Sequence, residues 1–150
     1  MTLQIGWNLE KALGSGMCLS AQKAEWQSVK FDNYSKTFIP KSRGVYIVSV
    51  SSNMFGRAEP FSLFHTPAYI GMSLDLRKRF DAHTASSHHD ALWRRLGKSK
   101  LFCTFWYAVF EYKSKSDLKK IEQNLIDIYG SPLNRINSVK TGSTLVGTVT

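Results

Sequence analysis

Residues 44–50 read GVYIVSV and residues 67–71 read PAYIG, and these two stretches decide the fold. The first is rich in β-branched residues and the second is a short run that ends at a glycine, so both predict β-strands. We expect the two strands to pair antiparallel. The connection over residues 51–66 is too long for a tight hairpin, which predicts a loop that can carry a function of its own.

Apolar periodicity and stop signals predict the other elements. They are a helix over 74–83 capped by Ser73, a short helix over 90–96 stopped by Gly97, a third strand over 103–112, and a last helix from Ser116 to Gly130. Residues 1–40 have no clean period, but their aromatic residues predict an arm that packs on the core. The Gly-, Ser- and Thr-rich residues 138–150 predict a loose tail.

The composition points toward a polyanionic partner. The chain has 150 residues, the usual size of one domain, and 20 Lys and Arg against 11 Asp and Glu give a formal charge of +9. This charge favours nucleic acid first and an acidic membrane second, with a merely soluble basic protein as the plain alternative.

Two further features bear on the compartment. No apolar run is long enough to span a bilayer, and residues 1–20 lack a signal-peptide pattern, so we expect a cytoplasmic protein without a membrane partner. The cysteines, Cys18 and Cys103, have no metal-ligand spacing and are expected to be free thiols.

One carboxylate lies where an apolar residue is expected. At 100° per residue, Glu122 falls between Leu118, Ile126 and Tyr129, with Leu125 close by, on the apolar face of the last helix. A buried carboxylate without a partner is costly, so a cation should accompany it. A salt bridge to Lys or Arg and a bound metal ion are both open.

The first helix carries two polar residues four positions apart. Arg79 and His83 project to the edge of its apolar face and should lean toward the sheet. The alternatives are local: an ion pair between Asp75 and Arg79, and a histidine with only a structural role.

Together these residues resemble the GIY-YIG nuclease family. The match consists of Gly44-Val45-Tyr46 and Tyr69-Ile70-Gly71, followed in the family's order by Arg79 and His83 in GMSLDLRKRFDAH, Glu122 in KKIEQNLIDIYG and Asn134 in SPLNR. The resemblance implies an α/β (α+β) fold with a small three-stranded antiparallel sheet flanked by helices. It places the nuclease domain over residues 41–137, between the N-terminal arm and the tail.

The resemblance also implies a role for each matched residue. Glu122 corresponds to the carboxylate that binds the metal, and Arg79 to the arginine that contacts the scissile phosphate. Tyr46 and Tyr69 correspond to the tyrosines that hold and activate the attacking water, and we assign Tyr46 as general base with Tyr69 positioning the water. His83 is expected to carry a proton or contact phosphate. Asn134 corresponds to an asparagine that supports the site.

Basic residues beyond this set are expected to contact the nucleic-acid backbone, with a solvated surface as the alternative. They are Arg77, Lys78, Arg94, Arg95, Lys98 and Lys100, with Lys113 and Lys115 further along the chain. Trp93 belongs either to this surface or to the core. His88-His89-Asp90 resembles a metal cluster, but adjacent histidines on a loop point apart and Asp90 suits a helix cap.

The resemblance therefore implies a divalent-metal-dependent DNA endonuclease that leaves 5′-phosphate and 3′-hydroxyl ends. The expected cofactor is Mg²⁺, with Mn²⁺ as a substitute, because Mg²⁺ prefers oxygen ligands and needs few protein carboxylates. RNA as a substrate and a monomer or a homodimer remain open. The rival function is a catalytically inactive module that binds nucleic acid without cutting it.

Overall fold

The computed structural model describes residues 18–51, 65–85, 91–130 and 133–134. A four-stranded antiparallel sheet has the order β1-β4-β2-β3. Its strands are β1 (Trp26–Lys30), β2 (Gly44–Ser51), β3 (His65–Ser73) and β4 (Cys103–Val109). The helices are α2 (Leu19–Lys23), η1 (Asn33–Phe38), α3 (Leu76–Thr84), α4 (Ala91–Leu96), η4 (Gly97–Phe102) and α5 (Lys115–Tyr129), η marking a 3₁₀ helix.

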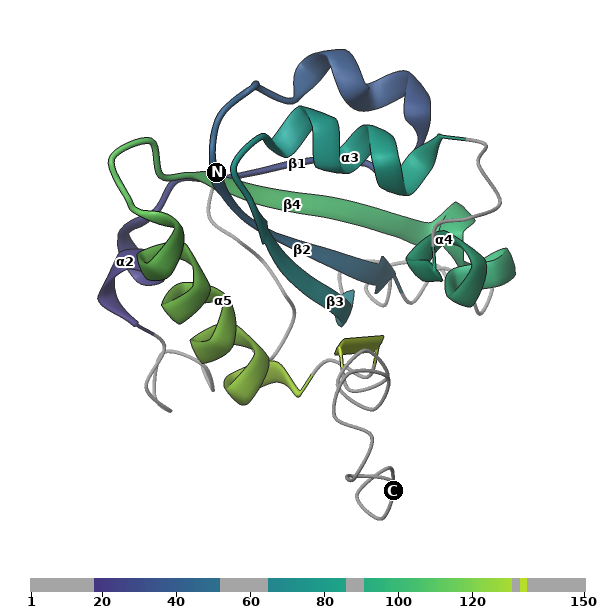
Figure 1. The fold of residues 1–150 in the computed structure, drawn as a ribbon. Helices are drawn as coiled ribbons and strands as arrows, with labels where there is room; N and C mark the ends of the chain where they lie inside the picture. Colours follow the sequence, from purple (N-terminus) through teal and green to yellow (C-terminus); the bar gives the residue numbers. More distant parts are fainter. Residues whose placement is uncertain (1–17, 52–64, 86–90, 131–132, 135–150) are drawn as a thin grey trace.

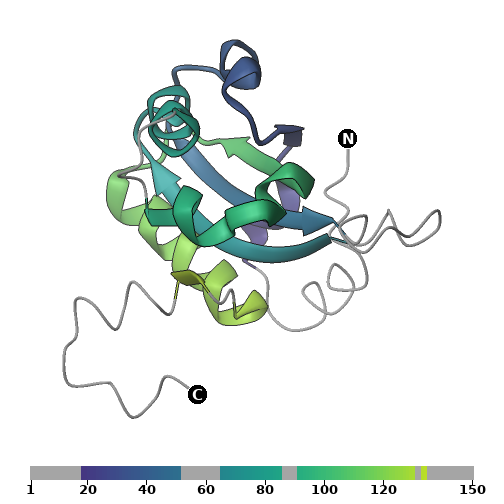
Figure 2. The same ribbon diagram turned by 90° about the vertical axis from the view of Figure 1, so that its right-hand side faces the viewer.

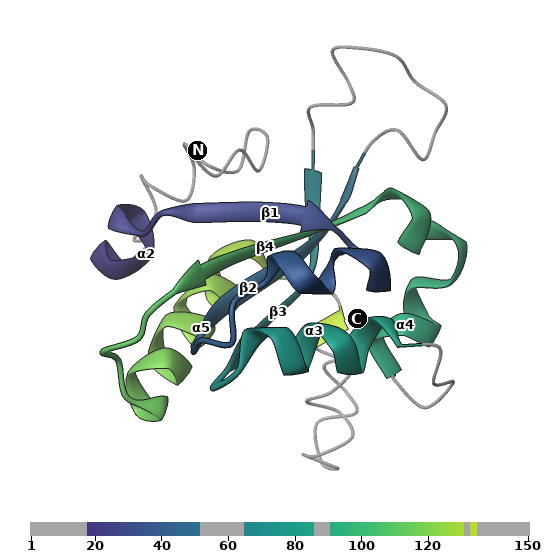
Figure 3. The same ribbon diagram turned by 90° about the horizontal axis from the view of Figure 1, so that it is seen from above.

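Helices cover both faces of the sheet, as Figures 1 and 2 show. Alternate residues of β2 point to opposite faces, so Val45 and Ile47 pack in one core cluster and Tyr46 and Val48 in another. The first cluster lies beneath α5 and α2. The second lies beneath η1, α3 and α4, and η1 runs beside α3 in Figure 3. The matched tyrosines therefore face the α3 side of the sheet.

The expected antiparallel pairing of the two motif strands is confirmed. Gly71 lies opposite Tyr46 and Tyr69 lies opposite Val48, with a register shift between Val48 and Ser49. Residues two apart along a strand point to the same face, so Tyr46 and Tyr69 are diagonal neighbours on one face.

The mixed class with an antiparallel sheet and flanking helices is also confirmed, but the expected strand number of three is wrong. The fourth strand, β1, comes from the residues assigned to the N-terminal arm and pairs with β4, from Trp26 opposite Ala108 to Lys30 opposite Thr104. This edge strand is only five residues long and has no alternating apolar pattern, so periodicity did not reveal it.

Several helix and strand ends differ from the predicted ones. The first helix is capped by Asp75 rather than Ser73, because Ser73 still belongs to β3. The strand β4 ends at Val109 rather than at residue 112. The last helix begins one residue before Ser116, since the Ser114 hydroxyl accepts a hydrogen bond from the Asp117 amide, and it stops at Gly130 in the left-handed conformation (φ 59°).

The structure tests some of the remaining expectations, and others concern residues that it does not describe. None of the helices in the described ranges is long and apolar enough to cross a membrane. Cys18 and Cys103 are both free thiols, as expected. Most of the loop over residues 51–66, the sequence His88-His89-Asp90 and the tail over 138–150 lie outside the described residues.

Replacing Trp26 tests whether β1 belongs to the cooperative core. The Trp26 side chain is 2% exposed and its Nε1 donates a hydrogen bond to the Ala21 carbonyl at 3.0 Å. We expect Trp26→Ala to lower the free energy of unfolding in urea by about 3–5 kcal/mol. Tyr34 is 93% exposed, so Tyr34→Ala should change the free energy of unfolding by no more than about 0.5 kcal/mol. Equal stability of both variants would show that β1 folds independently of the sheet.

Candidate active site

Helix α3 brings Arg79 and His83 to the face of the sheet that carries the tyrosines. The helix starts where the Asp75 carboxylate accepts a hydrogen bond from the Lys78 amide at 3.0 Å, and Leu76 and Phe80 bury its inner face. The local ion pair between Asp75 and Arg79 is not formed; within the described residues the ion pairs are Lys30–Asp32 and Lys36–Asp81.

The Tyr46 hydroxyl joins these two side chains. It lies 2.8 Å from Nε2 of His83 and accepts a hydrogen bond from Nε of Arg79 at 3.2 Å. Because Arg79 uses one lone pair of the oxygen, the phenolic proton is free to be donated to His83 when Nε2 is unprotonated. Tyr46 is fully buried and His83 is 2% exposed, so these contacts are shielded from water.

Tyr69 completes the cluster on its open side. Its ring lies 6.1 Å from that of Tyr46 and 5.8 Å from that of His83, measured between centroids. A pocket of about 80 Å³ opens next to it. The pocket is lined by Tyr69, Arg79, His83, Ala91, Leu92, Arg95 and Leu133. Tyr46 lies behind this wall and is not among the lining residues.

The two glycines of the motif are required by close packing. A Cβ atom on Gly71 would lie 2.4 Å from the Tyr46 hydroxyl oxygen, and one on Gly44 would lie 2.1 Å from the Ala108 carbonyl oxygen. Neither distance is sterically possible for a larger residue. Gly71 therefore provides the space in which the Tyr46 hydroxyl reaches α3.

Burial and the charge of Arg79 shift the pKa of Tyr46 in opposite directions. Burial raises the pKa of its hydroxyl well above the ordinary range, Tyr69 raises it further, and Arg79 lowers it. The pKa of Arg79 is itself raised, chiefly by Tyr46, so its guanidinium stays charged. In this environment Tyr46 keeps its proton unless another group accepts it.

Asn134 holds the outer edge of β3. Its side-chain oxygen accepts a hydrogen bond from the Ile70 amide at 2.8 Å, and its amide nitrogen donates one to the Ile70 carbonyl at 2.7 Å. The side chain thus takes the place of a neighbouring strand at the residue between Tyr69 and Gly71. Asn134 therefore fixes the edge of β3 beside Tyr69.

Glu122 approaches from the helix on the opposite face. It is partly buried on α5, and burial raises the pKa of its carboxyl, while Lys119 and then Arg79 lower it. No lysine or arginine in the described part of the chain forms an ion pair with it. Because the charge of Arg79 lowers the pKa of Glu122, this carboxyl group interacts electrostatically with the cluster of Tyr46, His83 and Arg79.

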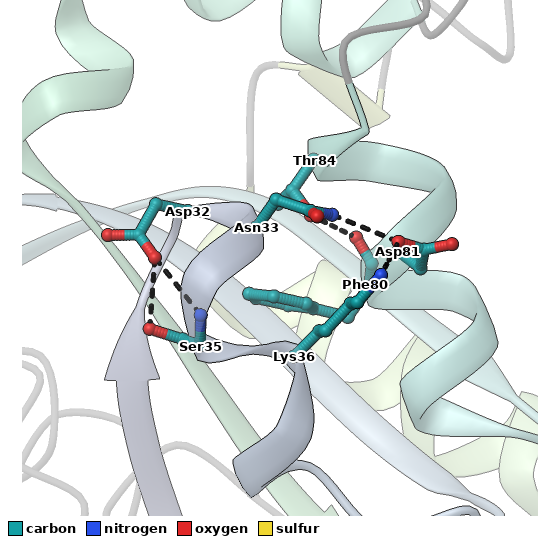
Figure 4. A network of polar contacts seen from close by, with 7 residues as sticks. All are labelled: Asp32, Asn33, Ser35, Lys36, Phe80, Asp81 and Thr84. Carbon is teal, nitrogen blue, oxygen red and sulfur yellow. Dashed lines mark hydrogen bonds and ion pairs between the residues drawn. The ribbon is translucent and has the colours of Figure 1, made fainter.

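The segment before β2 packs against α3 and is hydrogen-bonded to it, through contacts that sequence patterns did not reveal (Figure 4). Asn33 donates hydrogen bonds to Asp81 at 2.9 Å and to the Thr84 hydroxyl at 3.0 Å, and Lys36 forms an ion pair with Asp81 at 3.2 Å. Phe31, 2% exposed, packs its ring 6.4 Å from that of His83. Phe31, Asn33 and Lys36 lie in a segment without an apolar period, so only their contacts reveal this role.

The predicted nucleic-acid-binding residues lie in different environments. Arg77 uses its guanidinium to donate to the carbonyls of Ile39 at 2.6 Å and Thr37 at 3.3 Å, which fastens η1 to α3. The Lys100 ammonium lies 4.4 Å from the centre of the half-buried Trp93 ring. The others are exposed, and Arg95 lines the pocket: Lys78, Arg94, Arg95 and Lys98.

Comparison with known proteins finds one family match. The model of the GIY-YIG catalytic domain matches residues 43–137, more than half of the chain. The chain is also similar to a solved structure, the GIY-YIG N-terminal endonuclease domain of UvrC from Thermotoga maritima, a point mutant bound to its catalytic divalent cation. The identity is 19%, the TM-score is 0.41, and the alignment covers 64% of this chain and 86% of the other. No curated protein matches significantly.

The protein therefore belongs to the GIY-YIG catalytic domain family, and the resemblance found in the sequence is confirmed. Membership supports endonuclease activity and a nucleic-acid substrate.

Asn134→Ala removes both hydrogen bonds to the edge of β3. We expect it to lower the free energy of unfolding by about 1–3 kcal/mol, because the Ile70 amide and carbonyl lose their partner. Gln123→Ala, which removes an exposed bond to Asp127, should have an effect below about 0.5 kcal/mol. Urea denaturation measures both. Equal stability of the two variants would show that Asn134 does not hold the strand.

Proposed function

We propose that the protein is a divalent-metal-dependent DNA endonuclease that leaves a 5′-phosphate and a 3′-hydroxyl. The observation that carries this proposal is the buried Tyr46 hydroxyl held between His83 and Arg79, behind a pocket lined by Tyr69. Hydrolysis of a phosphodiester needs a positive group at the phosphate and an acceptor for the proton of the attacking water. The cluster contains both.

Arg79 is the phosphate-binding group in this proposal. Its Nε–H is directed at Tyr46 and its side chain also hydrogen-bonds to Tyr69. A guanidinium carries five N–H groups, so others remain for phosphate oxygens at the pocket. A guanidinium suits this role because it is planar, remains charged and binds two oxygens at once. Arg77 is engaged with the carbonyls of η1, which supports the assignment of Arg79.

Tyr46 and His83 act together as the proton acceptor. Because burial raises the pKa of Tyr46, a free phenolate is a poor starting state at neutral pH. Tyr46 lies behind the pocket wall, so this proposal requires the side chains of that wall to admit the attacking water to its hydroxyl. Tyr46 then takes a proton from the water and passes its own proton to Nε2 of His83, 2.8 Å away. Tyr69 lines the pocket and holds that water in place.

Glu122 fits a magnesium-type site better than a zinc-type one. No group of three or more His, Cys, Asp or Glu residues within the described ranges could hold a metal ion together, which disfavours metals that need several protein ligands. Mg²⁺ keeps most of its water shell and needs only one or two carboxylates, and a partly buried carboxylate without an ion pair suits it. When bound, Mg²⁺ or Mn²⁺ supplies charge neutralisation at the phosphate.

The remaining features of the proposal concern substrate and compartment. The formal charge of +9 favours a polyanion, and DNA is the proposed substrate, with RNA to be compared in the same assay. The two free thiols favour the reducing cytoplasm.

Plasmid nicking separates cutting from mere binding. Supercoiled plasmid is incubated with the protein in Mg²⁺, in Mn²⁺ and in a chelator, and the end groups of the products are determined. Nicking that requires the metal and leaves 5′-phosphates supports the proposal. A protein that shifts the plasmid in a gel but never nicks it would be the inactive nucleic-acid-binding module.

Glu122→Gln keeps the shape of the side chain and removes its charge. Cleavage should fall by orders of magnitude while DNA binding persists. Thermal unfolding gives a second readout: Mg²⁺ at a hundredfold its Kd should stabilise the wild type by about 2.7 kcal/mol but leave the variant unchanged.

The control for this prediction is the chelated protein. Burial raises the pKa of Glu122, so the folded state disfavours the carboxylate, and this contribution to stability falls as the pH rises through the shifted pKa. Without metal at neutral pH, Glu122→Gln should therefore be at least as stable as the wild type. Normal cutting by the variant would reject the metal role.

Replacing each tyrosine by phenylalanine separates their roles. Tyr46→Phe removes the hydroxyl that passes a proton to His83, so it should suppress cutting at every pH. Tyr69→Phe should keep measurable activity, because Tyr46 and His83 remain as the proton acceptor. The wild-type rate should rise with pH, because the route needs an unprotonated proton acceptor. Cleavage rates are measured against pH for all three proteins. Higher activity in Tyr46→Phe than in Tyr69→Phe would reverse the assignment.

A further inference from the structure

Two guanidinium groups from different helices line the same pocket. Arg79 comes from α3 and Arg95 from α4, and the other lining residues include His83 and Tyr69 but no carboxylate. Arg95 is exposed and, among the residues that the structure describes, forms no ion pair. Among the described residues, no ion pair neutralises the positive charge of this pocket.

The position of Arg95 is set by the core. Leu92 and Leu96, on either side of it along α4, are both 6% exposed and belong to the cluster beneath α3 and η1. A residue one turn after Ala91, which also lines the pocket, must share its side of the helix. Arg94, its neighbour in sequence, is exposed and does not line the pocket. Packing thus directs one of two adjacent arginines toward the site.

Two like charges at one small pocket repel each other unless an anion lies between them. Guanidinium groups bind phosphate oxygens in pairs of parallel hydrogen bonds, so two of them can hold one phosphate from two sides. We propose that Arg95 is a second phosphate-binding residue, which together with Arg79 grips one phosphate group of the polynucleotide in the pocket. This inference rests on the proposed nuclease function.

The proposal gives α4 a defined part in substrate binding. Exposed basic residues that track a backbone act through charge alone and lose their effect in salt. Arg95 instead contacts the phosphate beside Tyr69 and His83, so both its charge and its planar shape should matter. Lysine in its place should restore only part of the binding.

The test compares Arg95→Gln and Arg95→Lys with Arg94→Gln, which removes the same charge from the same helix outside the pocket. Affinity for a short DNA duplex is measured in the Glu122→Gln background, and kcat and KM are measured in the otherwise wild-type protein. We expect Arg95→Gln to lose about tenfold to a hundredfold in affinity and Arg94→Gln no more than about threefold. Arg95→Lys should fall between them.

A second probe uses inorganic phosphate in a chelator, at constant ionic strength, with thermal unfolding as the readout. Phosphate should raise the Tm of the wild type and of Arg94→Gln more than that of Arg95→Gln. If wild type nicks DNA but Arg95→Gln and Arg94→Gln behave alike in both assays, Arg95 is only a surface charge and the inference is wrong. If wild type never nicks while Arg95→Gln alone loses phosphate binding, the nuclease function fails and the phosphate site stands.

Discussion

The arrangement of the site depends on one hydroxyl group that is cut off from water. The Tyr46 oxygen is fully buried, and a buried polar group must be hydrogen-bonded within the protein. His83 and Arg79 satisfy it, and Gly71 leaves the space that it occupies. Each requirement constrains a separate element: the register of β2 on β3, the position of α3 and the absence of a side chain at the end of the motif.

The N-terminal residues described here lie outside the matched family domain, yet they help to satisfy these constraints. Strand β1 extends the sheet, Phe31 fills the space behind His83, and Asn33 joins the end of α3 to η1. Helix α3 has only nine residues and depends on tertiary packing for its stability. The described part of this segment thus supports the site structurally.

Local rules were sufficient for the elements with strong patterns. The motif strands, the last helix and the order of the matched residues could be predicted, because β-branched runs, apolar periodicity and stop signals act over a few positions. The same rules marked Glu122 as a carboxylate on an apolar face, and its partial burial agrees with that pattern. Element ends were less certain, as the cap at Asp75 rather than Ser73 shows, because either side chain suits the position.

What the sequence determined by itself was therefore the family, the type of fold and the set of candidate residues. Only the tertiary structure decided which of them meet. It placed Arg79 against Tyr46 and Arg77 against the carbonyls of η1, although both lie on one helix two residues apart. It also added a fourth strand and turned Arg95, but not Arg94, into the pocket. These outcomes depend on contacts between residues far apart in the chain, which no local pattern encodes.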